Sequence, residues 1–214
     1  MDGAKAVAKL VVAVGLVWVF PGPQVAALFS RPDLSLTPPA PAPLPVDGGA
    51  VVPPYPANLT ANGWLQQAKP FCNAVEVVGY LRANPFPSGE DGAAHAAACL
   101  ALAGLVDDAR RLILELPSDA RWRAAGVVFE AGHPAADAGD DLAAGPLMEL
   151  VVEFWPNHYM ALYHAGAACY ERGEAARARD YLERFLAEYH ADDGWTGSAR
   201  GMLEELAKRD GGGS

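Results

Sequence analysis

The sequence is poor in positive charge, because 16 Lys and Arg stand against 26 Asp and Glu and give a formal net charge of -10. A surface that binds nucleic acid needs clustered Lys and Arg to displace phosphate counterions. We therefore exclude nucleic acid as a partner. β-Branched residues become scarce after the first quarter of the chain, whereas Ala, Gly and Arg are abundant. This composition favours closely packed helices, so the expected fold class is all-α.

The sequence also lacks the usual signatures of catalysis and of cofactor binding. Cys72, Cys99 and Cys169 follow neither a CxxC pattern nor the Cys/His spacing of a zinc site. They allow one disulfide at most within a chain, or they serve as small buried hydrophobic residues in helices. The sequence contains no GxSxG motif, no Cys/His nucleophile signature and no glycine-rich phosphate loop. We predict a protein without catalytic activity and without a cofactor.

Residues 1–29 are predicted to form a membrane anchor or a signal segment. An apolar run covers residues 10–20, follows Lys5 and Lys9, and stops at a Pro-Gly-Pro sequence. Its length suits the apolar part of a secretory signal, and residues 25–27 offer a cleavage site. Alternatively, flanking residues extend the run to the roughly 20 that a bilayer requires. As an anchor, the run would place these residues in lipid: Leu10, Val14, Leu16, Trp18 and Phe20.

The two lysines before the apolar run predict the orientation of the chain. Positive charge stays on the cytoplasmic side, so the remainder of the chain is expected outside the cytoplasm, in the periplasm if the protein is bacterial. Cleavage would instead give a secreted protein. A third interpretation is a cytoplasmic adaptor whose N-terminus inserts into a partner.

Residues 30–62 are predicted to be an extended linker, because they contain several proline runs. Such runs favour the polyproline II form, which rises about 3.1 Å per residue. The linker is either solvated or lies along a partner. A helical domain is expected over residues 63–208, followed by a flexible tail over 209–214. At its start, apolar residues from Trp64 to Val78 recur at helical spacing and predict one helix face, which ends at the 84–89 cluster.

Three segments of the predicted domain repeat the same pattern of small, apolar and turn residues. The clearest covers residues 159–192, where Gly166 and Ala178 are the small residues of two crossing helices and Gly173 with Glu174 forms the turn. Weaker units cover 95–117 and 121–156, the second with an unusually long turn, and residues 195–206 read as a capping helix. The 159–192 unit resembles a tetratricopeptide (TPR) repeat, with these residues at or beside the family's positions: Leu162, Ala165, Gly166, Tyr170, Gly173, Glu174, Ala178, Leu182 and Phe185. His190 replaces the terminal proline of the family.

The resemblance implies stacked antiparallel helix pairs that hold a partner peptide in a groove lined by the first helix of each pair. Carried over by position, it points to Met160, Tyr163, Tyr170 and Glu171 as partner-binding residues. The alternative for each is ordinary packing between repeats. The favoured function is a non-catalytic, membrane-tethered scaffold for protein–protein interaction, such as an accessory or assembly subunit of a membrane complex.

One acidic segment, residues 133–141, departs from the repeat pattern. Its carboxylates could bind a cation such as Ca²⁺, although the spacing is not that of an EF-hand. The favoured interpretation is that Asp140 and Asp141 cap the N-terminus of a helix, and partner contact is a further alternative. His158 and His164 are six residues apart and form a poor metal pair. The alternative function is an exported soluble enzyme or metal-binding protein that uses this segment.

Overall fold

The computed structural model describes residues 59–211, and within them it shows an all-α fold without any strand. The predicted anchor and all of the predicted linker up to residue 58 lie outside the described residues. None of the described helices is both long and apolar enough to cross a bilayer. The elements are α1 (Ala61–Ala68), η2 (Lys69–Phe71), α2 (Val77–Ala83), α3 (Glu90–Leu102), α4 (Val106–Glu115), α5 (Ser118–Asp137), α6 (Asp141–Phe154), α7 (Tyr159–Glu171), α8 (Ala175–Glu188) and α9 (Gly194–Gly211).

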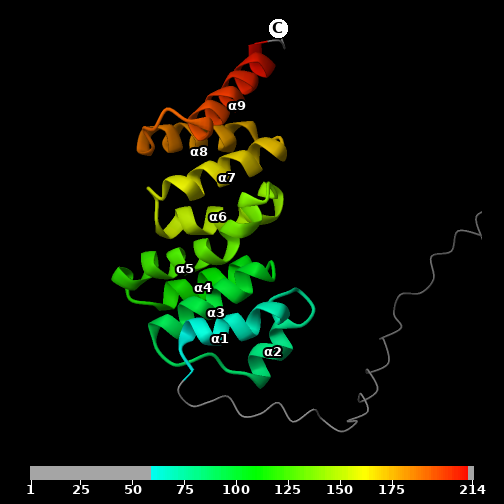
Figure 1. Ribbon diagram of the computed structural model, residues 1–214, viewed down its shortest axis with the longest axis vertical. Helices are drawn as coiled ribbons and strands as arrows, with labels where there is room; N and C mark the ends of the chain where they lie inside the picture. Colours follow the sequence, from blue (N-terminus) through cyan, green and yellow to red (C-terminus); the bar gives the residue numbers. More distant parts are fainter. Residues whose placement is uncertain (1–58, 212–214) are drawn as a thin grey trace, which may run out of the picture. The chain divides into compact units, whose positions relative to one another are not determined.

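Helices α3 to α8 stack in the order of the chain (Figure 1). Helix α3 packs on both α4 and α5, α5 packs on α6, α6 on α7, and α7 on α8. Helix α1 covers α3 at one end of the stack, and α9 contacts α7 and α8 at the other. Three hairpins, α3–α4, α5–α6 and α7–α8, thus form the body of the domain.

The same turn joins the two helices of every hairpin. Gly104, Gly139 and Gly173 have φ angles of 79°, 84° and 76°, in the left-handed region that glycine enters without strain. After each glycine, the next residue donates its N–H to the carbonyl five residues earlier, over 2.9 to 3.0 Å. This is the Schellman pattern of a helix C-terminus. The three glycines are 35 and 34 residues apart, so the hairpins recur with a nearly constant period.

Glycines also set how closely the two helices of a hairpin approach. A Cβ on Gly132 of α5 would lie 2.7 Å from Leu147 of α6, and a Cβ on Gly166 of α7 would lie 2.7 Å from Leu182 of α8. The two glycines are 34 residues apart and occupy equivalent positions. Ala178 is fully buried at the second crossing. The predicted role of Gly166 and Ala178 as small crossing residues is therefore confirmed.

A Gly166→Ala variant should lower the free energy of unfolding by about 1–2 kcal/mol, because overpacking a helix crossing costs more than the gain in helix propensity. Gly201→Ala is the matched control, since a Cβ there meets no atom within 4 Å on the exposed side of α9. The control should be neutral or stabilising by up to about 1 kcal/mol. Urea unfolding measures both. Equal effects at the two sites would contradict the close approach of α7 and α8.

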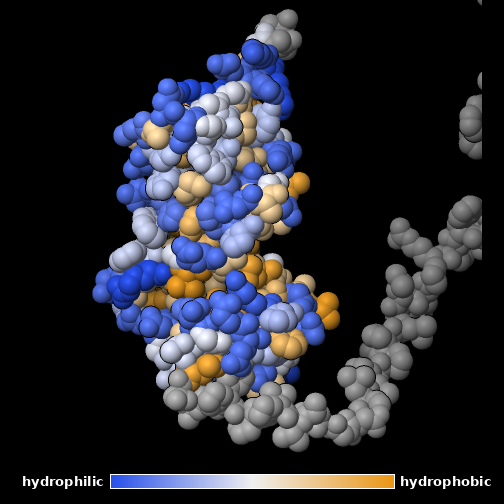
Figure 2. Space-filling model, in the orientation of Figure 1, coloured by the Kyte–Doolittle hydropathy of each residue, from blue (hydrophilic) through white to orange (hydrophobic). Residues whose placement is uncertain are grey.

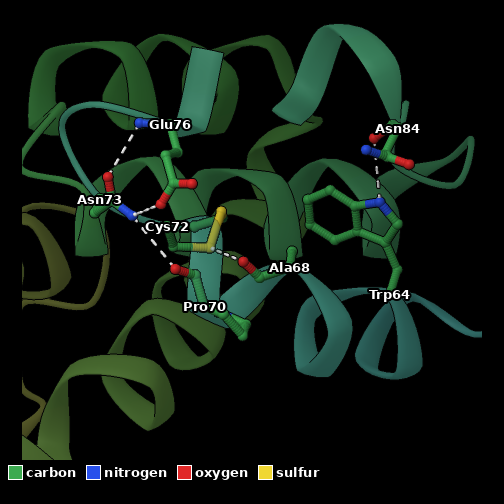
Figure 3. Close-up of a disulfide and its surroundings, with 8 residues drawn as sticks. Trp64, Ala68, Pro70, Cys72, Asn73, Glu76 and Asn84 are labelled. Carbon is green, nitrogen blue, oxygen red and sulfur yellow. Dashed lines mark hydrogen bonds between the residues drawn. A yellow bond between two sulfur atoms is a disulfide. The ribbon is translucent and has the colours of Figure 1, made fainter. Parts of the chain in front are cut away.

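The N-terminal part of the domain is held by a buried tryptophan and a disulfide (Figure 3). Trp64 is fully buried, packs against Tyr80 and Phe86, and donates its indole N–H to the Asn84 carbonyl over 3.4 Å. The disulfide joins Cys72, just after η2, to Cys99 in α3. Cys169 is a buried free thiol. The sequence left the pairing of the three cysteines open, and the structure pairs the first two.

The prediction of one helix face from Trp64 to Val78 is wrong in its second half. Pro70 lies in the short helix η2, the chain turns at residues 72–76, and α2 begins only at Val77. Val75 is 90% exposed and Val78 is 53% exposed, so neither belongs to the core. The disulfide at Cys72 and the cap of the turn by Asn73, which accepts the N–H groups of Val75 and Glu76, override the helical spacing.

Two other boundaries also differ from the prediction. Helix α5 continues through Pro134 to Asp137, so most of the acidic segment 133–141 is helix and the long turn shrinks to residues 138–140. A proline near the end of a helix disrupts little, because few backbone bonds remain to be lost beyond it. Helix α9 continues to Gly211, so residues 209–211 are helical and not part of a tail.

Replacing Cys72 and Cys99 together by Ala should destabilise the fold by about 3–4 kcal/mol, the chain-entropy effect of opening a loop of this length. The two cysteines are 27 residues apart. Cys169→Ala is the control, because it removes a buried sulfur without opening a loop. Chemical unfolding under non-reducing conditions compares the variants. A double variant that costs no more than the control would show that the disulfide does not stabilise this domain.

Candidate functional site

Two adjoining hollows lie along α5 and together form what we call the aromatic groove. The first has a volume of about 590 Å³ and is bordered by α1, η2, α3 and α5. The second has a volume of about 400 Å³ and lies between the end of α5 and the start of α7. Glu130 and Trp155 line both hollows, so the two hollows adjoin. The groove therefore runs across the first helices of the three hairpins, α3, α5 and α7.

Large aromatic side chains line the groove and remain partly exposed. Trp122 is 47% exposed and meets Trp155 edge to face, with ring centroids 5.4 Å apart. In the second hollow, Tyr159 is 42% exposed and stacks on Tyr189. Met160 lies beside it. Tryptophan and tyrosine are the residues that most often anchor protein interfaces, because they offer a large rigid surface at a low entropic cost.

Outside the groove the described surface is mixed, because other large hydrophobic residues are exposed there as well: Phe71, Val75, Val78, Leu114 and Leu142. All large hydrophobic residues that are exposed lie between Phe71 and Tyr159, and Figure 2 shows that α7 to α9 present a mainly hydrophilic surface in that view. The second helices, α4, α6 and α8, border a separate hollow lined by Arg110, Glu149, Glu153, Arg177, Asp180 and Arg184. Most of these charged side chains form ion pairs, including Arg110 with Glu153 over 2.8 Å and Arg177 with Glu149. The aromatic groove is thus the more apolar of these two surfaces.

A second cluster lies beside the groove, where the end of α5 meets α7. His133 and Asp137 are one helical turn apart on α5, and His164 comes from α7. One donor atom of each residue lies within 4.8 Å of the others. His133 also lines the second hollow of the groove. We call these three residues the histidine cluster.

The surroundings of the histidine cluster fix both imidazole rings. His164 is 1% exposed, and its Nδ1 lies 2.7 Å from the carboxylate of Asp141 at the start of α6. His133 stacks on Phe129 with ring centroids 4.5 Å apart. The Nε2 atoms of both histidines are buried and have no hydrogen-bond partner. His133 Nε2 lies 3.2 Å from Asp137, but not in hydrogen-bonding geometry.

Asp140 caps α6, as predicted, by accepting the N–H of Ala143 over 3.0 Å. The carboxylate of its neighbour Asp141 lies 2.7 Å from His164 Nδ1 instead. The acidic segment is therefore divided between a helix cap and the histidine cluster, and it does not form a loop of convergent carboxylates.

His158 lines the second hollow and caps the N-terminus of α7. Its Nδ1 accepts the N–H of Ala161 over 3.3 Å, and its ring lies between those of Phe129 and Trp155. Burial is the main cause that lowers the pKa of His158. The neutral imidazole is the form that can accept the capping bond, because protonation occupies Nδ1.

The four predicted partner-binding residues do not lie on one surface. Met160 lines the second hollow. Tyr163 is buried and packs against Phe185 and Trp195, a position that favours the packing alternative. The Tyr170 hydroxyl donates to Glu205, and Arg209 stacks on its ring, so this side chain faces α9. Glu171 is exposed at the end of α7.

Sequence reasoning missed the residues that dominate both sites. Trp122 lies between Arg121 and Arg123, and Trp155 lies beside Pro156 at the end of an apolar run, and neither was singled out as an exposed residue. His164 was compared only with His158 on its own helix, whereas its neighbour is His133, 31 residues earlier. The available signal was the spacing of His133 and Asp137, which share a helix face if the segment is helical.

Comparison with protein-family models, with curated proteins and with solved structures finds no match for this chain. The function must therefore be argued from the two sites.

The stability of the protein should fall as the pH drops below about 6.5, partly through His158. Because its pKa is lower in the folded chain than the ordinary value of 6.5, the unfolded chain binds more protons in that range, and stability is lost as pH falls through the folded-state pKa. His158→Asn keeps a good N-cap and removes the titration. Between pH 7 and pH 5 the variant should lose about 1 kcal/mol less than the wild type, the typical value of one cap. Equal losses in urea unfolding would contradict this role.

Proposed function

We propose that this chain is a non-catalytic, TPR-like scaffold, tethered to a membrane by its N-terminal segment, whose aromatic groove holds a segment of a partner protein. The groove is the observation that carries the proposal. It combines partly exposed tryptophan and tyrosine rings with about 990 Å³ of hollow surface in two adjoining parts. Grooves of this kind hold peptide segments through a few large apolar side chains.

The period of the hairpins supports the TPR-like assignment. A TPR unit is a helix–turn–helix of 34 residues, and the turn glycines here recur at 35 and 34 residues. The groove also lies along the first helix of each hairpin, where the resemblance places the partner. A membrane complex to which this scaffold contributes as an accessory or assembly subunit is part of the same proposal.

The disulfide supports an extracytoplasmic location, in the periplasm if the protein is bacterial. Disulfides form and persist in oxidising compartments and are rare in the cytosol. The bond between Cys72, just after η2, and Cys99 joins the first part of the described domain to α3.

The charges at the groove define the partner segment further. Lys69 borders the first hollow and has no acidic partner among the described residues. Arg123 also borders it and pairs with Glu90 over 2.9 Å. Glu130 is exposed and lines both hollows. We therefore expect a segment with two or more large apolar side chains, a carboxylate that reaches Lys69 and a basic group that reaches Glu130.

Photo-crosslinking in the producing cells tests the docking site. A benzophenone amino acid at Trp122 should give an adduct with one segment of one protein, identified by mass spectrometry. Leu114 on α4 is the control position, because it is similarly exposed, at 46%, and lies outside the groove. Equal adducts from both positions, or none from Trp122, would overturn the groove as the docking site.

Binding of the identified segment as a synthetic peptide then measures the contribution of the groove. Trp122→Ala should weaken binding about 30-fold, the effect of an interface residue worth about 2 kcal/mol. Leu114→Ala should leave the affinity unchanged. Fluorescence anisotropy of the labelled peptide gives the dissociation constant of each variant. Circular dichroism checks that the variants remain folded. Equal affinities for the two variants would count against the proposal.

A further inference from the structure

We propose that His133, Asp137 and His164 bind a transition-metal ion, Zn²⁺ by preference, with Asp141 positioning His164. The site adjoins the second hollow of the groove, which His133 also lines. Three side chains from two helices bring one donor atom each into a space no wider than 4.8 Å. Two imidazoles and a carboxylate are a common ligand set of zinc sites in proteins.

The buried histidine provides the strongest evidence. The Asp141 carboxylate can only accept a hydrogen bond, so the proton of neutral His164 lies on Nδ1 and the lone pair on Nε2. The His164 side chain is only 1% exposed, and its Nε2 atom is buried without a hydrogen-bond partner. A buried acceptor without a partner is costly, and a metal ion would satisfy it. A carboxylate on the far nitrogen is also the usual support of a metal-binding histidine.

The second histidine repeats this feature. His133 Nε2 is likewise buried without a hydrogen-bond partner. Its ring centroid lies 5.5 Å from that of His164, and its stacking on Phe129 holds it in place. His133 Nε2 lies 3.2 Å from the Asp137 carboxylate, so two buried imidazole nitrogens and one carboxylate lie together.

The geometry requires only a small closure. Zinc–nitrogen bonds of 2.0–2.1 Å place tetrahedral ligand atoms about 3.3 Å apart. The donor atoms of the cluster lie within 4.8 Å of one another, so they must move inwards by up to about 1 Å to reach that spacing. Asp137 allows this, because its side chain is 55% exposed at the last turn of α5. The three protein ligands leave a fourth position for water.

The ligand types distinguish this site from the Ca²⁺ site considered for the acidic segment. Calcium takes six to eight oxygen ligands, whereas imidazole nitrogen suits Zn²⁺ and its first-row neighbours. Asp140 is occupied as the cap of α6. The bound ion would join the end of α5 directly to α7, two helices that otherwise pack mainly through α6.

Metal titration of the full-length, tag-free protein in detergent tests the site. After removal of metal with a chelator, calorimetry should show one Zn²⁺ per chain, and Co²⁺ should give the intense visible absorption of a tetrahedral nitrogen–oxygen site. His133→Asn and Asp137→Asn should each weaken Zn²⁺ binding at least 100-fold. Asp141→Asn should weaken it about 10- to 100-fold, the usual effect of losing a carboxylate behind a histidine ligand.

His190→Asn is the matched control, because His190 is exposed and outside the cluster. It should bind Zn²⁺ like the wild type. Thermal unfolding gives a second readout: Zn²⁺ should raise the melting temperature of the wild type and of His190→Asn, but not that of His133→Asn. The substituted ligands, His133 and Asp137, lie at the partly exposed end of α5. Circular dichroism checks the folding of both variants before titration.

Three results would overturn the proposal: no Zn²⁺ bound by the wild type, equal binding by His133→Asn and His190→Asn, or a preference for Ca²⁺. Each would leave the cluster as a hydrogen-bonded packing feature only. Because the titration contains no partner, its failure does not affect the docking site. Photo-crosslinking at Trp122 in the presence of a chelator likewise tests the groove without the metal.

Discussion

The close packing of α6 against α5 and α7 determines the positions of both candidate sites in this domain. Leu147 on α6 meets Gly132 of α5, where an added Cβ would lie 2.7 Å from the leucine. Gly145 on α6 meets Ala168 of α7, where an added Cβ would lie 2.5 Å from the alanine methyl. Neither contact has room for another carbon atom. Helices α5 and α7 are therefore held on α6 at a spacing that only the smallest residues allow.

Both candidate sites depend on this spacing. His133 directly follows Gly132, and His164 lies one turn before Ala168, so the same two contacts that fix the helices bring the imidazoles together. The second hollow, which His133 also lines, lies between α5 and the start of α7. A larger residue at Gly132 would displace the groove wall and the histidine cluster together. The two sites differ in their chemistry, but both depend on the packing of α6 against α5 and α7.

The sequence predicted those parts of the structure that depend on local interactions. Gly173 after an amphipathic segment, and Asp140 before another, specify a helix end and a helix start, and both are confirmed. The small residues of the 159–192 unit also marked the α7–α8 crossing correctly. These features could be found because the cause and the effect lie within a few residues of each other.

The parts that could not be predicted arise from contacts between distant residues. No spacing rule pairs Cys72 with Cys99, because the bond depends on the turn of residues 72–76 lying against α3. Trp122 is 47% exposed, and its edge-to-face contact with Trp155 depends on the packing of α5 against the end of α6. The histidine cluster required in addition that α5 pass through Pro134, which the sequence argued against.

The composition of the core gives a physical reason for cross-links in this fold. Alanine contributes most of the buried residues of α3 and many of those of α5 and α7. Alanine allows close packing but buries little apolar area, so each helix contributes less hydrophobic free energy than a leucine-rich helix would. The disulfide between η2 and α3 compensates for this at one end of the stack. A metal ion between α5 and α7 would act in the same way in the middle, by joining two helices whose shared contacts are few.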